Sequence, residues 1–334
     1  MQEIHRTRLE INSAQIFAWG FAAFCALAAL AVGSFPLAAS IVTIFLFAGV
    51  HNLMEFRYFA ARMPLVWGKS RLYYSVGIAG VIVLTVGYLS IYFGSGNWLW
   101  SADGWQIAVS TWSTSFVLWV GLLFYLRGRQ KPQTDWTLAL AAAFLLAAAA
   151  WLAPPYWSLL MVYLHPLVAL WFLDRQIRRT KKEWLKAFHF CLALIPIFLL
   201  MLWLALSDRP DVSAETTLFW RISQHAGSQI LPHVSTHLLV ATHVFLETIH
   251  YAVWIVLIPL ADPRAVPWKM REIPFFAGKK GFPKLVAAAM ALSVILVLAL
   301  WLGFSIDYTR TRDIYFAFAM AHVLAEFPFL IKML

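Results

Sequence analysis

Residues 242–251 read Thr-His-Val-Phe-Leu-Glu-Thr-Ile-His-Tyr, inside an apolar run that continues through Trp254 to Leu260. Apolar runs of about 17 residues or more recur along the whole chain, and each can cross a bilayer as a helix. The chain is 62% hydrophobic and 13% charged, whereas a soluble domain is about half apolar and about a quarter charged. The sequence therefore predicts an all-α, polytopic membrane helix bundle.

The apolar runs predict about ten transmembrane helices in a single transmembrane domain, residues 1–334, with both termini in the cytoplasm. With this topology, all but four of the 26 Lys and Arg residues lie on the cytoplasmic side, as the positive-inside rule requires. The four on the outer side are Arg209, Arg221, Arg310 and Arg312. The predicted spans are 14–33, 37–57, 72–93, 105–126, 136–153, 156–174, 184–206, 234–260, 284–304 and 313–331.

The net charge of +10 thus reflects topology, and no nucleic-acid partner is expected. Both cysteines, Cys25 and Cys191, lie in apolar runs, which argues against a disulfide framework and against a cysteine-based metal site. We expect a multi-pass protein of the bacterial cytoplasmic (inner) membrane whose partners include membrane lipids. The sequence does not predict an oligomeric state.

Three glutamates lie clearly within apolar spans, and each follows a histidine by four residues. The pairs are His51 and Glu55, His243 and Glu247, and His322 and Glu326. Residues four apart share one face of a helix. A carboxylate in the hydrocarbon layer costs about 2.5 kcal/mol or more unless it is paired or bound. A histidine precedes all three glutamates at the same spacing, which indicates a common role. We interpret the pairs as metal ligands in preference to neutral hydrogen-bonded pairs.

The predicted topology places these residues in the middle or the cytoplasmic half of spans that all run from outside to inside. Imidazole and carboxylate ligands without thiolate suit iron, and less well manganese or zinc. The number of ligands is enough for one or two ions. The predicted metal ligands are His51, Glu55, His165, His243, Glu247, His250, His322 and Glu326.

The other histidines have simpler interpretations. A lone histidine in a membrane helix usually hydrogen-bonds to a neighbouring helix, and we expect this role, or an interfacial position, for His189, His225 and His233. His165, which precedes Pro166, is balanced between ligand and packing residue. His237 lies less than one turn from the ligand face and is an additional candidate.

Residues 48–55, Ala-Gly-Val-His-Asn-Leu-Met-Glu, resemble a motif of the Brp/Blh family of bacterial membrane carotene oxygenases, Gly-x-Pro-His-Gly-Ala-x-Asp. Val50 replaces the proline, Asn52 the glycine and Glu55 the aspartate. A helix with paired histidines in that family resembles residues 243–250, and a histidine just before an acid in its last span resembles His322 and Glu326. The resemblance implies an iron-dependent enzyme that cleaves a carotenoid.

The leading hypothesis is therefore an iron-dependent membrane oxygenase or oxidase that cleaves, hydroxylates or desaturates a carotenoid-like or other lipid-soluble substrate. Such an enzyme would need an external electron donor, because no nucleotide-binding motif is present. Alanine at Glu247 or His322 is expected to remove metal and activity together. The alternatives are a transporter for divalent metal or protons, a haem protein ligated by opposed histidines, and a structural subunit of a membrane complex.

Overall fold

The computed structural model describes residues 2–94, 101–131, 137–213, 215–266, 269–277 and 281–334. All regular elements in these ranges are helical, and nine of the helices are long and apolar enough to cross a membrane. The predicted all-α fold is confirmed, and the chain is a multi-pass membrane protein. The orientation with both termini in the cytoplasm remains a prediction.

Eight of the nine spanning helices are continuous, and the ninth joins three consecutive segments. The eight are α1 (Gln2–Ser34), α2 (Pro36–Arg62), α3 (Arg71–Phe93), α4 (Ala102–Gln130), α6 (Pro154–Thr180), α7 (Leu185–Leu206), α12 (Pro283–Ile306) and α13 (Tyr308–Met333). The joined helix comprises α9 (Thr236–Ala252), the π-helical segment η4 (Val253–Leu257) and α10 (Ile258–Ala261). The connections contain α8 (Thr217–His225), α11 (Pro274–Ala277), η1 (Gly68–Ser70), η3 (Lys182–Trp184), η5 (Pro263–Ala265) and η6 (Met270–Glu272).

The predicted fifth span is present as a shorter helix, α5 (Thr137–Leu152). Its 16 described residues extend about 24 Å at 1.5 Å per residue, and position 136, where the predicted span begins, lies outside the described residues. The helix packs closely along α4, because Gly121 has no side chain and a Cβ there would lie 2.7 Å from the Cβ of Ala143. Near its other end, Trp151 Nε1 donates to Thr114 Oγ1 over 2.8 Å. α5 is thus a tenth apolar helix beside the nine long ones.

The helices group into two compact units. Unit 1 comprises Met1–Arg57 and Met161–Lys269, and unit 2 comprises Tyr58–Leu160 and Met270–Leu334. Each unit contains membrane-spanning helices, so this grouping does not separate a soluble part from a membrane part. The single transmembrane domain remains a prediction.

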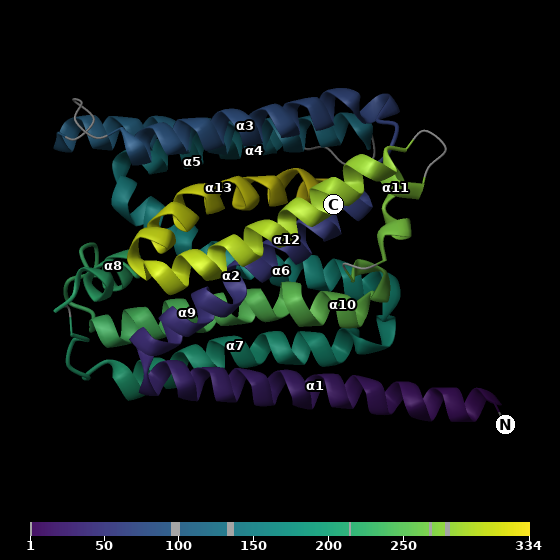
Figure 1. Ribbon diagram of the computed structural model, residues 1–334, viewed down its shortest axis with the longest axis horizontal. Helices are drawn as coiled ribbons and strands as arrows, with labels where there is room; N and C mark the ends of the chain where they lie inside the picture. Colours follow the sequence, from purple (N-terminus) through teal and green to yellow (C-terminus); the bar gives the residue numbers. More distant parts are fainter. Residues whose placement is uncertain (1, 95–100, 132–136, 214, 267–268, 278–280) are drawn as a thin grey trace. The chain divides into compact units, whose positions relative to one another are not determined.

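In unit 1, α9 is the most deeply buried helix. It packs against α1 and α7, which also pack against each other (Figure 1). The side chains of Val240, Ala241, Val244 and Phe245 are completely buried, as expected for a helix that packs against other helices on several sides. His237 Nε2 donates to the carbonyl of Gly33 at the end of α1 over 2.9 Å. α9 is therefore the element of unit 1 whose side chains are most shielded from lipid and water.

In unit 2, α13 packs against α3, α4 and α12. The Tyr73 hydroxyl donates to the carbonyl of Pro328 over 2.6 Å, which joins α3 to α13. At the end of α13, Lys332 Nζ donates to Ser70 Oγ over 2.7 Å and to Gln130 Oε1 over 2.5 Å. These contacts fix the end of α13 within its own unit.

Candidate metal centre

The first His-x-x-x-Glu pair lies on α2 in unit 1, and both of its side chains are buried. His51 and Glu55 are each 1% exposed, and one helical turn separates them. The ring nitrogen Nδ1 of His51 lies 3.1 Å from the carbonyl oxygen of Phe47. A carbonyl can only accept, so Nδ1 carries the proton and Nε2 carries the lone pair. This hydrogen bond orients the ring in the way that is usual for a histidine that ligates a metal.

His250 of α9 joins this pair within the same unit. Its ring lies edge-on to the ring of His51, with 5.3 Å between the centroids, and it is 2% exposed. One ligand atom from each of His51, Glu55 and His250 can be chosen so that all three lie within 4.8 Å of one another. Ligand atoms about 2.1 Å from a common ion lie about 3.0–3.4 Å apart in octahedral or tetrahedral geometry. The three groups would thus need to approach one another by up to about 1.8 Å to share an ion.

His165 of α6 approaches the same histidine from another side. The ring centroids of His165 and His250 are 4.7 Å apart, and a ligand atom of each lies within 4.8 Å of the other. His165 is half-buried, and the following Pro166 is buried within α6. The structure therefore brings together four of the predicted ligands, from three helices of unit 1.

The second His-x-x-x-Glu pair, on α9, has different partners. Glu247 Oε1 accepts a hydrogen bond from the hydroxyl of Tyr251 over 2.7 Å, and Glu247 Oε2 lies 3.9 Å from His243 Nδ1. His243 and Glu247 are not among the residues whose ligand atoms gather around His250 in the described parts of the chain. Their role as metal ligands stays a prediction, whereas the hydrogen bond from Tyr251 gives Glu247 a partner of its own.

The third pair lies on α13 in unit 2. Glu326 is completely buried and His322 is half-buried, and they share one face of the helix at a spacing of four residues. Complete burial is consistent with a functional carboxylate. Their participation in the same site as the ligands of unit 1 stays a prediction.

Two aromatic side chains and one histidine near these ligands were not predicted. The ring centroid of Tyr251 lies 4.3 Å from that of His51. Its i+4 position relative to Glu247 is a signal that could have identified it. His225, at the end of α8, has its ring centroid 5.0 Å from that of His243. The ring centroid of Tyr163 lies 5.8 Å from that of His243. Nothing in the local sequence places His225 or Tyr163 beside His243, because this depends on how α8 and α6 pack on α9.

Two further histidines form hydrogen bonds away from this cluster. His189 Nε2 lies 2.9 Å from Asp174 Oδ1, which matches the interhelical hydrogen bond expected for it. His237 donates to the carbonyl of Gly33. A carbonyl cannot donate in return, so this nitrogen of His237 carries a proton and is not a metal-binding atom in this arrangement.

A change of helix type lies immediately after the ligand on α9. The π-helical segment η4 begins at Val253, three residues after His250. Pro259 lacks a backbone N–H, and its ring conflicts with the carbonyl four residues earlier, at Ile255 within η4. This accounts for a departure from α-helical hydrogen bonding here. Single π turns occur frequently at functional sites, so the position of η4 is consistent with a site at His250.

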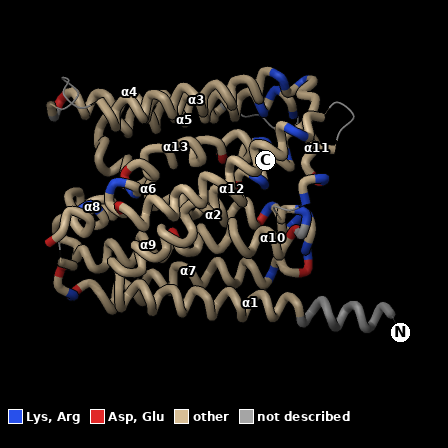
Figure 2. The backbone as a smooth tube through the Cα atoms, viewed as in Figure 1, with Lys and Arg blue, Asp and Glu red and all other residues tan. Residues whose placement is uncertain are grey.

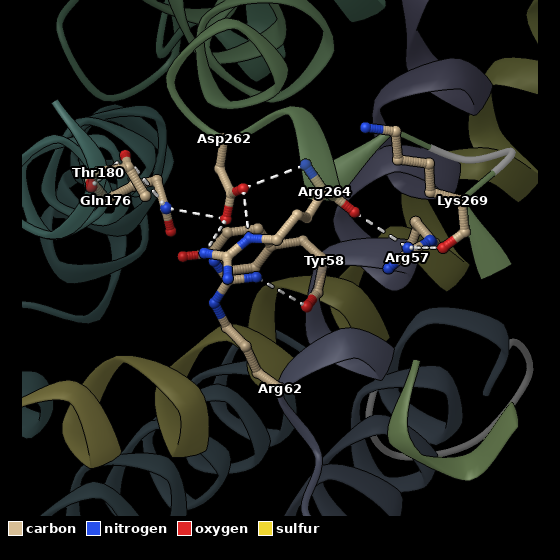
Figure 3. Close-up of polar contacts among 8 residues, drawn as sticks. All are labelled: Arg57, Tyr58, Arg62, Gln176, Thr180, Asp262, Arg264 and Lys269. Atoms are coloured by element: carbon tan, nitrogen blue, oxygen red, sulfur yellow. Dashed lines mark hydrogen bonds and ion pairs between the residues drawn. The ribbon is translucent and has the colours of Figure 1, made fainter. Parts of the chain in front are cut away.

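A polar network ties together the ends of the three helices that carry the ligands (Figure 3). Arg57 of α2, which is completely buried, donates through Nη2 to the carbonyls of Arg264 and Lys269 over 3.1 and 2.7 Å. Asp262, which follows α10, accepts from Gln176 Nε2 of α6 over 3.0 Å. Asp262 also accepts from Nε of Arg264 over 2.9 Å. These bonds join α2, α6 and the α9–α10 helix at one end, and so restrain the ligands that these helices carry.

Changing Tyr251 to phenylalanine is expected to lower stability and leave the metal content unchanged. The change removes the donor to a buried carboxylate, which should cost about 1–3 kcal/mol, and it removes none of the four clustered ligands. Thermal melting and metal analysis of the purified protein would measure the two effects. Tyr156→Phe, at a tyrosine that is 58% exposed, is the matched control. Loss of metal in Tyr251→Phe alone would contradict the expectation and would count Glu247 among the ligands.

Comparison of the chain with protein-family models, with curated proteins and with solved structures gave no match. Function is therefore inferred from the residues of the cluster and from their surroundings.

Proposed function

We propose that this chain is an integral-membrane, iron-dependent oxygenase or oxidase that acts on a lipid-soluble substrate. The observation that carries the proposal is the buried group of His51, Glu55 and His250 on membrane-spanning helices. Two imidazoles and one carboxylate are the typical ligand set of non-haem iron(II) oxygenases, in which the other coordination positions of the metal stay open. His165 beside His250 offers a fourth ligand.

The chemistry of the donors supports iron. All of them are nitrogen or oxygen atoms, and the two cysteines, which would favour other metals, are buried elsewhere on α1 and α7. The negative charge of Glu55 is costly in a membrane interior unless a cation compensates it. One ion would use His51, Glu55 and His250, with His165 beside His250 as a further candidate, and a second would require the predicted ligands His243, Glu247, His322 or Glu326.

In such an enzyme, the bound iron would supply the activation of dioxygen, and the protein would supply orientation and exclusion of water. The carbonyl of Phe47 keeps the proton of His51 on Nδ1 and directs Nε2 toward the cluster. Burial of His51, Glu55 and His250 keeps bulk water away from the ligands. The membrane location of these helices suits a substrate that partitions into lipid, and the resemblance to carotene oxygenases suggests a carotenoid-like molecule. The bacterial cytoplasmic membrane and an external electron donor belong to the same proposal.

Metal analysis followed by oxygen labelling tests this proposal. The protein would be expressed with ample iron and purified in mild detergent without chelators. We expect one or two iron ions per chain. Incubation with carotenoid and lipid extracts, a reductant and ¹⁸O₂ should then give a labelled product, or consumption of dioxygen with a desaturated product. His250→Ala is the negative control. A protein that contains no metal, or contains iron but consumes no dioxygen with any extract, would contradict the proposal.

The π-helical segment favours one alternative, a transporter of divalent metal ions. Transporters often bind their ions beside interrupted membrane helices, and η4 and Pro259 interrupt the helix directly after His250. The same ligands would then hold an ion only transiently. Metal uptake by proteoliposomes that contain the protein, abolished in His250→Ala, would support the transporter; tightly retained iron without uptake would support the oxygenase.

A further inference from the structure

A groove with a volume of about 610 Å³ lies between α6 and α7 in unit 1. Its apolar walls are formed by Leu167, Leu170 and Trp171 of α6 and by Leu192, Ile195 and Leu199 of α7. The residues from α6 recur at spacings of three and four, on the side of that helix away from His165. The groove is thus separate from the metal centre described above.

One end of the groove is polar, and its acidic group is already engaged. Asp174 lines this end and accepts hydrogen bonds from Arg178 Nε over 2.6 Å and from His189 Nε2 over 2.9 Å. The bond to His189 also joins α6 to α7 at this polar end of the groove. The carboxylate is therefore paired within the protein and does not need a ligand.

Arg175 lines the same end and is not paired in this way. Its guanidinium carbon lies 6.0 Å from the centroid of the Trp171 ring. Its Nε is buried and has no hydrogen-bond partner among the residues that the structure describes. A buried donor without an acceptor is costly, and guanidinium groups bind phosphate groups through paired N–H donors. Arg175 as a whole is half-buried, so an anionic group at the mouth of the groove would pair with its outer guanidinium nitrogens.

The surroundings of Arg175 are also positively charged. Lys and Arg residues gather at the end of unit 1 where α6 and α10 finish (Figure 2). The positive-inside rule assigns such an end to the cytoplasmic side, and the cytoplasmic leaflet is the one that carries anionic lipids. The groove thus combines an apolar channel at membrane depth with a cationic end at headgroup level.

We propose that this groove is a binding site for an anionic glycerophospholipid. One acyl chain lies between the apolar walls from α6 and α7, and the phosphate binds the guanidinium of Arg175. Net negative lipids are preferred over zwitterionic ones, because Asp174 is paired with Arg178 and His189, which leaves Arg175 as the cation of the groove lining.

Native mass spectrometry of the delipidated full chain tests the site. Phosphatidylglycerol and phosphatidylcholine with the same acyl chains would be titrated separately. The wild type is expected to bind phosphatidylglycerol more tightly. Arg175→Gln should weaken that binding about fivefold, the effect of one cationic side chain near a lipid phosphate. It should weaken phosphatidylcholine binding less, because the choline cation offsets the charge of the phosphate in that lipid. Arg179→Gln, which removes the same charge from an exposed position on α6 outside the groove lining, is the matched control.

A second variant tests the apolar part of the groove independently. Leu199→Trp should fill the channel and weaken the binding of both lipids, with the thermal melting of the variant confirming that it folds. Equal phosphatidylglycerol binding by the wild type and Arg175→Gln would overturn the proposal. So would glycerophosphate, a headgroup without acyl chains, if it competed as well as the intact lipid, because the site would then recognise a free anion.

Discussion

Substituting glutamine for Glu55 is expected to remove the metal and, at the same time, to stabilise the metal-free protein. Glutamine keeps the volume of the side chain and removes the only negative charge among His51, Glu55 and His250. Loss of a group that merely supports a ligand weakens metal binding about 10–100-fold, so loss of the ligand itself should weaken it on the order of 100-fold or more. Without metal, a buried carboxylate is unfavourable, and the amide should be more stable by about 2 kcal/mol.

Thermal melting with and without a chelator, together with metal analysis, measures both parts of this prediction. Chelation should lower the melting temperature of the wild type and leave Glu55→Gln unaffected. Glu183→Gln, which changes an exposed carboxylate of η3, should behave as the wild type. If His51 and Glu55 form only a neutral hydrogen-bonded pair, chelation will not change the wild type, and the metal interpretation of this pair will be wrong.

Replacing Arg57 by methionine is expected to destabilise the protein by about 3 kcal/mol and to weaken metal binding as well. Arg57 is completely buried and donates to the carbonyls of Arg264 and Lys269. A hydrogen bond from a charged group contributes about 1.5–3 kcal/mol, and the two carbonyls would lose their donor. Glu55 lies only two residues earlier on α2, so a loosened helix end should also shift a metal ligand.

The melting temperature and the dissociation constant for the metal would be measured in the same detergent. Arg57→Lys keeps one donor group and should restore part of the loss. Arg62→Met is the control on the same helix, because Arg62 bonds to the carbonyl of Tyr58 one turn earlier in α2. A melting temperature of Arg57→Met within one degree or so of the control would show that the bonds from Arg57 to the carbonyls of Arg264 and Lys269 contribute little to stability.

The helices were largely predictable from the sequence, because long apolar runs ended by charged residues or proline leave few alternatives in a membrane. The predicted span 72–93 corresponds to α3 (Arg71–Phe93), and 184–206 corresponds to α7 (Leu185–Leu206). The predicted span 136–153 likewise agrees with α5 (Thr137–Leu152) over the described residues. One feature was not predictable in this way, because η4 follows from a local conflict at Pro259 that has no signal in hydropathy.

The candidate site was predictable in part, and His-x-x-x-Glu shows why. This spacing places two side chains on one face of a helix, but it does not say which neighbouring helix that face meets. The pair on α2 meets His250, whereas Glu247 on α9 meets Tyr251 on its own helix. Identical local patterns therefore have different partners, because the partners depend on the rotation and packing of each helix within the unit.

The π-helical segment η4 has a consequence for how this chain tolerates insertions and deletions. A π turn contains about one more residue than an α turn, and each residue rotates an α-helix by about 100°. Removing one residue from Val253–Leu257 would convert this turn to regular α-helix and would leave the residues before Asp262 in nearly the same phase relative to His250. The reason is that four residues of α-helix complete about the same rotation as the five residues of η4. A one-residue deletion within η4 should therefore be tolerated better than a one-residue deletion in a segment that remains α-helical.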